Sequence, residues 1–265
     1  TAMPIMLAWK LHKANVLSDD ELKSWYGKML KPAADFLVDG GLAKILWNDT
    51  QITPPATQQE RWEEQEGYSP STTAAIVAGL ITASDIATLS GDDKNAKRYL
   101  ETAKKYNSEI ESQMFTTKGN LKSENTDGEY FIRIGQDTDA NSDTKINANN
   151  GREGFNKKQI LDGGFLELVR YGVRGANDES IVKTLPEYDD ETLEDNLQVK
   201  YTFSFEDGSG TFAGYRRYGN DGYGEDEVTG TNYAEGGANT PGQRGRVWPF
   251  FTGERGHYEI AVANA

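Results

Sequence analysis

The sequence is organised around the stretch Glu60-Arg61-Trp62-Glu63-Glu64-Gln65-Glu66-Gly67-Tyr68-Ser69-Pro70. This stretch gathers four carboxylates, an indole, a phenol and a guanidinium directly ahead of an alanine-rich helical pattern. Acidic side chains are rarely buried unpaired, and a tryptophan beside them supplies an apolar wall that can hold a carboxyl group in its protonated form. A neutral carboxylic acid next to an aromatic surface is what cleavage of a glycosidic bond requires. The stretch therefore indicates sugar chemistry.

A long helix is predicted to follow this stretch. Ser69-Pro70 opens it, because proline at an early helical position loses no hydrogen bond there. Its residues are apolar nearly all round and its alanines keep it thin, so we expect an inner helix that neighbours approach closely. An outer, amphipathic helix is expected next, over 94–114. The residues predicted to face inward on it are Ala96, Tyr99, Leu100, Ala103, Tyr106 and Ile110.

Helices are also predicted ahead of the stretch. Apolar residues recur at helical spacing over 3–13. Ser18 and Glu21 form a capping-box pattern, which marks the start of a second helix. This helix is expected to pass Pro32 with a kink and to end at Gly40-Gly41.

The rest of the chain combines shorter helices with extended segments. A second inner helix is expected over 159–171, an outer one over 178–185, and a short strand over 130–134. Alternating residues predict strands over 199–205 and 211–218, which would pair as a hairpin. Inner and outer helices in alternation, joined by long loops and without a fixed repeat period, indicate an all-α toroid of the α/α type. Its site would lie at one mouth, where the loops converge.

Composition narrows the classes of partner. The chain has 265 residues and a net charge of -14, which repels phosphate backbones and anionic lipid, so neither nucleic acid nor a membrane surface is an expected partner. We also find no apolar run long enough to span a membrane. The absence of cysteine excludes disulfides and thiolate catalysis, and the two histidines exclude a multi-histidine metal centre. Neutral substrates such as sugars remain.

Three loops carry the unusual residues: 60–68, 215–225 and 246–259. If they share one mouth, a proton donor, aromatic walls and hydroxyl-binding groups would meet there. The residues predicted for these roles are Glu63 as donor, Trp62 and Trp248 as walls, and Arg217 with Asp221 as hydroxyl ligands. Simpler explanations stay open, since both tryptophans could be core residues and Arg217 could bridge Glu225. Glu64 and Glu66 are expected to face solvent or to be ion-paired.

Asp137, Asp139, Asn141 and Asp143 alternate as the oxygen ligands of a calcium loop do. The match is partial, because Ser142 replaces the expected glycine and position twelve is Ala148, which has no carboxylate. We therefore expect a solvated loop and no cofactor, with calcium as the less favoured alternative.

Several stretches resemble the bacterial branch of glycoside hydrolase family 15, the glucoamylases and glucodextranases. The matching segments are 2–9, 31–36, 59–74, 160–170, 218–225 and 248–259, which lie in family order and cover essentially the whole chain. The resemblance implies an (α/α)6 barrel and an inverting exo-hydrolase that releases β-glucose from α-1,4-glucan oligosaccharides or polysaccharides. It also favours an extracellular or periplasmic location.

The resemblance carries over to individual residues. Glu63 falls on the general acid of the family's Trp-Glu-Glu motif. The positions that match sugar-contacting residues are Trp62, Glu64, Arg217, Asp221 and Trp248.

One feature departs from the family pattern. An inverting mechanism needs a second carboxylate, about 6.5–9.5 Å from the first, to activate water. The family's Pro-Glu-Gln segment, which carries this base, has no counterpart before Ala265. We therefore expect residues 1–265 to be one catalytic domain truncated at both ends, with flanking segments missing and the base beyond Ala265. Glu254 and Glu259 are weak substitutes, since Glu254 is expected to pair with Arg255 or Arg246. A glucodextranase-type α-1,6 hydrolase and a non-catalytic glucan-binding fragment remain as alternatives.

Overall fold

The computed structural model describes residues 1–44, 50–146, 154–194, 196–232 and 242–265. Most of the regular structure is helical. The helices are α1 (Ala2–Lys13), α2 (Asp19–Trp25), α3 (Lys31–Asp39), α4 (Pro70–Leu89), α5 (Asp93–Ser108), α6 (Ile110–Met114), α7 (Leu166–Arg170), α8 (Glu179–Tyr188) and α10 (Pro249–Ala263). Short turns of π- or 3-10 helix are η1 (Tyr26–Leu30), η2 (Lys157–Gln159) and η3 (Gly163–Phe165). The strands pair antiparallel as β1 (Gly41–Leu42) with β2 (Gln51–Ile52), β3 (Phe115–Thr116) with β4 (Tyr130–Phe131), and β5 (Lys200–Phe205) with β6 (Gly210–Tyr215).

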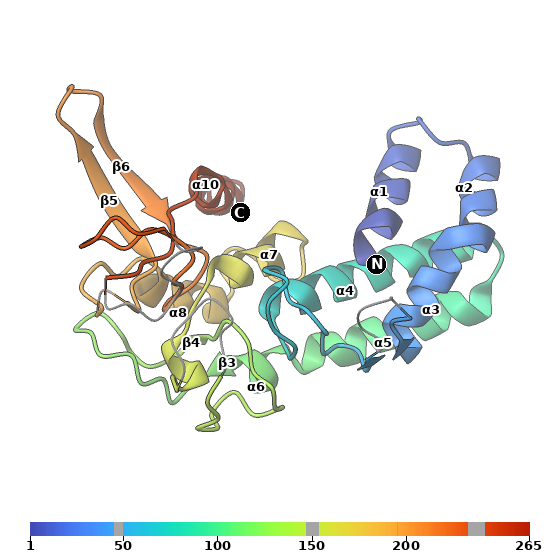
Figure 1. Cartoon of the computed structure of the whole chain (residues 1–265). Helices are drawn as coiled ribbons and strands as arrows, with labels where there is room; N and C mark the ends of the chain where they lie inside the picture. The colour runs from blue at the N-terminus through green and yellow to red at the C-terminus, as the bar shows by residue number, and fades with distance from the viewer. Residues whose placement is uncertain (45–49, 147–153, 195, 233–241) are drawn as a thin grey trace.

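Helix α4 is the centre of the helical region and joins it to the rest of the molecule (Figure 1). It packs against α1, α3 and α5 in the helical region and also against α7 outside it. Leu80 and Ile86 are completely buried, so the predicted inner helix is confirmed. Gly79 permits the approach of α1, since a Cβ atom there would lie 2.8 Å from that of Ala2.

By length and composition α4 could also cross a membrane, although no apolar run in the sequence was expected to be long enough. Its packing explains the composition, because 56% of its most apolar window is buried inside the protein. An apolar helix enclosed by other helices is a core helix.

Where a kink was predicted at Pro32, the structure has a widened, π-helical turn of the helix just before it. Ser18 caps α2, and its hydroxyl and the carboxylate of Glu21 form the expected capping box. Pro32 has no N–H to donate to Lys28, and the π-helical turn η1 lies immediately before α3. Gly40 then ends α3 in the left-handed region with a φ of 66°.

Two predicted helices differ from the structure. The expected helix over 94–114 divides at Glu109 into α5 and α6, and Leu100 is 36% exposed instead of facing inward. The expected helix over 159–171 becomes regular only at Leu166. Asp162 accounts for this delay, because its carboxylate accepts a hydrogen bond from the Gly164 N–H at 2.8 Å and starts the short turn η3 instead.

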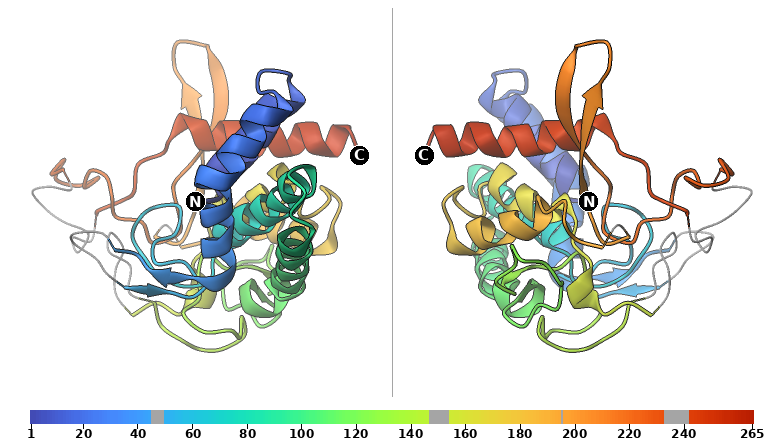
Figure 2. Two further views of the ribbon diagram at one scale, coloured as in Figure 1. Left: turned by 90° about the vertical axis from the view of Figure 1, so that its right-hand side faces the viewer. Right: turned by 90° about the vertical axis from the view of Figure 1, so that its left-hand side faces the viewer.

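The other half of the molecule is rich in loops (Figures 1 and 2). The β5–β6 hairpin has the predicted pairing, with Lys200 opposite Tyr215 and Phe205 opposite Gly210. Helix α10 packs against β6 and α7, and the hairpin tip extends beyond it. The predominantly helical class and the small hairpin are confirmed. Within the residues described, the helices do not close into a barrel (Figure 1).

Candidate active site

The loop 60–65 is a tight turn that separates its carboxylates. The Glu60 N–H donates to the Gln65 carbonyl at 2.9 Å, and the Glu63 N–H donates to the Glu60 carbonyl at 2.9 Å. Glu63 adopts a φ of 59°, a left-handed conformation that is uncommon for a residue with a Cβ atom and that often occurs at functional sites. The turn exposes the Glu63 side chain, whereas Glu60 is buried.

Glu63 lies at a cavity of about 560 Å³. The cavity is bounded by the start of α1, the end of α3, the segment 52–63 and the first turns of α4. Two further carboxyl groups, those of Glu60 and Glu167, also line it. Burial raises the pKa of Glu167 to about 7 and also raises the pKa of Glu60. The cavity therefore combines an exposed carboxyl with two that burial disposes toward the protonated form.

Trp62 is held from three sides. Its Nε1–H donates to Asp162 Oδ2 at 3.1 Å, its ring meets that of Phe251 edge-on at 5.2 Å, and the Arg61 guanidinium lies 4.5 Å from the ring centre. Asp162 is buried, and that burial raises the pKa of its carboxyl group. Trp62 is half-buried against the core and does not line the Glu63 cavity. Its contacts fix one side of the loop that carries Glu63.

Glu64 points into the protein, away from Glu63. Its carboxylate is bound by Arg217 Nη1 at 2.6 Å, by Arg133 Nη2 at 3.2 Å and by the Tyr218 hydroxyl. The expectation of an ion-paired Glu64 therefore holds. The predicted sugar contact remains a separate question, since Glu64 does not line the Glu63 cavity.

Arg217 and Asp221 form the pair that the sequence suggested. Arg217 Nε and Nη2 each donate to the carboxylate of Asp221 at 2.8 Å, a bidentate geometry. Asp221 is buried and also accepts from the Tyr223 N–H at 2.9 Å. The alternative bridge from Arg217 to Glu225 is wrong, because Arg246 Nε binds Glu225 at 2.9 Å.

The third loop, 246–259, contacts the other two loops through its first residues and through α10. Trp248 caps α10, and its N–H donates to the Tyr215 carbonyl at 3.0 Å. Its ring is half-buried against the core, and Nε1 is enclosed without a partner among the residues that the structure describes. The Arg246 N–H donates to the Tyr223 carbonyl at 3.1 Å, so the third loop contacts the second, which the pair of Arg217 and Glu64 joins to the first.

Glu254 is ion-paired as expected, but with a different arginine. Arg61 Nη2 binds Glu254 at 2.7 Å, and Arg170 lies 3.9 Å away. The proposed partners have other ligands, since Arg255 binds Asp189 at 2.9 Å and Glu259, while Arg246 binds Glu225. The pair from Arg61 to Glu254 therefore ties the central loop to α10.

Three contributors were missed by sequence reasoning: Arg133, Asp162 and Glu167. Arg133 had been read only as part of a strand, yet it is completely enclosed and binds Glu60 at 2.9 Å. Asp162 and Glu167 stand in the otherwise apolar run 160–169, and an acidic residue in such a run is the signal that could have indicated them.

In the loop 137–143, which was considered as a calcium site, oxygen atoms accept hydrogen bonds from lysine ammonium groups. Lys157 Nζ, which is fully buried, donates to Asp137 Oδ1 and to the Asp139 carbonyl, both at 2.6 Å. Asp143 binds Lys158 at 2.8 Å. Ala148 lies outside the described residues. Two of the four candidate ligands, Asp137 and Asp143, are thus paired with ammonium groups, so we continue to favour a solvated loop over a calcium site here.

The chain is similar to known proteins in both sequence and fold. The chain matches the family described as "Glycosyl hydrolases family 15" over residues 1–265. It is 36% identical over 261 residues to a glucoamylase of Clostridium sp. (strain G0005), covering 98% of this chain and 31% of that protein. A crystal structure of a bacterial glucoamylase complexed with acarbose is similar in fold, with a TM-score of 0.76 and 36% identity, over 98% of this chain and 32% of that one. The chain thus spans about a third of the length of these relatives. It belongs to glycosyl hydrolase family 15.

Proposed function

We propose that this chain provides the acid side of an inverting exo-hydrolase that acts on α-1,4-glucans and releases β-glucose, with Glu63 as the proton donor. The observation that carries the proposal is the position of Glu63, which a left-handed backbone presents to the 560 Å³ cavity. A general acid needs such access, because it must come within hydrogen-bond reach of the leaving oxygen.

The groups around Glu63 support the assignment. Glu60 and Glu64 are engaged by Arg133 and Arg217, which leaves Glu63 as the carboxylate of the Trp-Glu-Glu motif that faces the cavity. We expect the general base, the carboxylate that activates water, to lie beyond Ala265. Neither Glu254 nor Glu259 supports an alternative, since Arg61 and Arg255 bind them.

The substrate class follows from the relatives. Both compared proteins are named glucoamylases, and one of them was bound to acarbose. We infer that this chain contributes to binding of the same class of α-glucan oligosaccharides, with Trp62, Glu64, Arg217, Asp221 and Trp248 as the candidate contacts.

The test compares Glu63 with an exposed glutamate outside the site. Glu63→Gln in the enzyme that contains this chain should lower the rate of β-glucose release from maltooligosaccharides by about 100- to 10,000-fold, the range for loss of a general acid. Glu101→Gln is the control, because Glu101 is an exposed glutamate on α5 that lines neither this cavity nor any other part of the proposed site. Equal turnover in both variants would refute the assignment.

The same assays separate the alternatives. Faster release from dextran than from soluble starch would identify an α-1,6 hydrolase. Calorimetric binding of maltose without any glucose release would identify a non-catalytic glucan-binding protein.

A further inference from the structure

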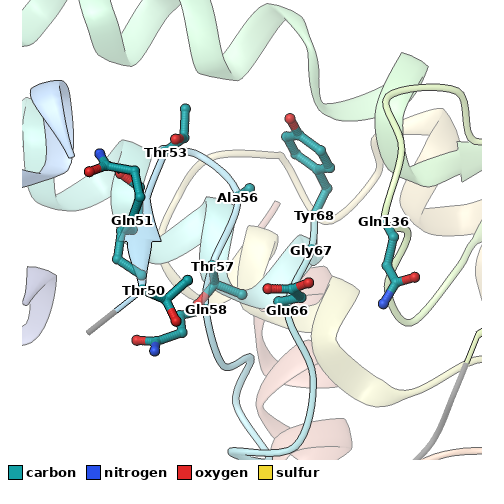
Figure 3. Close-up of a pocket in the computed structure, with 11 residues that line it drawn as sticks. Thr50, Gln51, Thr53, Ala56, Thr57, Gln58, Glu66, Gly67, Tyr68 and Gln136 are labelled. Carbon is teal, nitrogen blue, oxygen red and sulfur yellow. The ribbon is translucent and has the colours of Figure 1, made fainter. Parts of the chain in front are cut away.

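Figure 3 shows a second cavity, of about 200 Å³. Ile52, Ala56 and Thr57 line both cavities, so the segment 52–57 forms a shared wall. Glu66 lines the second cavity, whereas Glu63 lines the first. One loop therefore presents a carboxylate to each of two neighbouring cavities.

Short backbone bridges fix the shape of this second cavity. Thr57 and Gly67 exchange hydrogen bonds at 2.8 and 2.9 Å, and Tyr68 and Gly135 exchange them at 2.7 and 3.0 Å. Gly67 is required between these bridges, because its φ is 138° and an added Cβ would lie 2.4 Å from the Gly135 carbonyl oxygen. Three separate segments are thus joined side by side, and the cavity is preformed.

The lining of the second cavity is that of a site for a neutral polar ligand. Amides and hydroxyls dominate it, and Glu66 is the one charged residue among its described lining residues. Figure 3 shows Tyr68 and Gln136 on one side and Gln51 and Gln58 on the other. Paired donors and acceptors beside an aromatic ring suit the hydroxyls and C–H faces of a sugar, while the single negative charge disfavours anions.

Gln58 gives independent evidence of a ligand. Its Nε2 atom is enclosed and has no hydrogen-bond partner among the residues that the structure describes. An enclosed amide donor without a partner destabilises the fold, so such groups usually meet a ligand or water. Gln58 lines the second cavity and not the one at Glu63.

We propose that this second cavity is an accessory carbohydrate site that binds one glucose unit of an α-glucan. The choice of a glucan as the ligand rests on the proposed function. The inference that the ligand is neutral and polar rests on the residues that line the cavity alone. Gln58 and Gln136 hydrogen-bond the sugar hydroxyls, Glu66 accepts from a hydroxyl, and Tyr68 offers a ring face. Because the two cavities share a wall, a polymer held in one lies next to the other.

Maltotriose binding tests the proposal in full-length protein carrying Glu63→Gln, which prevents consumption of the ligand. Titration calorimetry should show two classes of site. Gln136→Ala and Gln58→Leu should each weaken one class by about 3- to 10-fold, as expected for loss of a hydrogen bond, and leave the other class unchanged. Gln136 is exposed, so its truncation leaves folding intact. Asn120→Ala removes an exposed amide that lines neither cavity and should change nothing.

The outcomes separate this proposal from the proposed function. A single class of site, or two classes that neither Gln136→Ala nor Gln58→Leu affects, would overturn the accessory site even if Glu63 proves catalytic. Conversely, if Glu63→Gln left hydrolysis intact, the same titrations would be made with a maltotriose analogue that the enzyme cannot hydrolyse, and weaker binding in the two glutamine variants would still support the accessory site. Glycerol at the same concentration should not displace maltotriose, since a simple polyol lacks the ring face that Tyr68 requires.

Discussion

The helical region formed by α1–α5 and the loop region around residues 60–68 bury their polar groups in different ways. In the helical region, ion pairs such as that of Arg98 with Asp35 lie at a half-exposed surface. In the loop region, Arg133 is completely enclosed and binds two carboxylates, those of Glu60 and Glu64. Apolar contact therefore stabilises the helices, whereas the loops depend on charges that must stay paired, because an unpaired buried charge is costly.

The largest expected effect is the loss of Arg133. Arg133→Met should lower the free energy of unfolding by about 3–5 kcal/mol, because it leaves the carboxylate of Glu60 buried without its cationic partner. Arg98→Met is the matched change in the helical region and should cost less than about 1 kcal/mol, as partly exposed pairs do. Urea unfolding of both variants measures the difference. Equal losses would show that the two regions do not differ in this respect.

Sequence patterns predicted the helical region well because its determinants are local. The apolar circumference of α4, the cap at Ser18 and the glycine at position 40 each act within a few residues. The prediction of a helix over 159–171 was wrong because Asp162 and two glycines offer the backbone an alternative hydrogen-bonded turn. Such competition is decided by tertiary contacts, here the hydrogen bond from Trp62.

The site was predictable in part. The sequence indicated which three loops meet, and the structure brings them into contact. It did not indicate the partners, since Arg61 and Glu254 are 193 positions apart and no periodicity relates them. It also could not distinguish the directions of Glu63 and Glu64. A single left-handed φ at Glu63 turns neighbouring carboxylates to opposite sides.

A cavity in the helical core should cost nearly as much as the broken ion pair. Leu80→Ala should lower the free energy of unfolding by about 2–5 kcal/mol, because Leu80 is completely buried and the helices around it cannot close the gap. Leu100→Ala is the control, since Leu100 is 36% exposed and its truncation should cost about 0.5 kcal/mol. Thermal unfolding of both variants distinguishes them. A large loss for Leu100→Ala would instead support the inward position that the sequence had indicated.

The pH dependence of stability should also differ between the regions. Burial raises the pKa of Glu167 from 4.5 to about 7 in the folded protein. Between these values the folded state holds a proton that the unfolded state has lost, so the free energy of unfolding falls as the pH rises. The contribution of Glu167 is up to about 3 kcal/mol, present below pH 4.5 and lost above pH 7.

Glu167→Gln isolates this effect from the other buried carboxyls of the loop region, such as Glu60 and Asp162. Denaturant unfolding of the wild type and the variant at pH 5 and pH 8 should show a smaller decline in the variant. Glu101→Gln, an exposed change on α5, should leave the decline unchanged. A decline of equal size in all three proteins would contradict the assignment to Glu167.

The smallest effect tests whether the two regions are independent. Ser18→Ala should lower the free energy of unfolding by about 1 kcal/mol, because it removes the capping box of α2. Ser24→Ala lies within the same helix, where alanine is favourable, and should be neutral or slightly stabilising. The losses in unfolding free energy caused by substitutions at sites without shared partners add to within about 0.5 kcal/mol. The double variant Ser18→Ala with Arg133→Met should therefore lose the sum of the two single losses. A clear departure from that sum would mean that α4, which belongs to the helical region and also packs against α7 and η3, couples the cap of α2 to the buried charges of the loops.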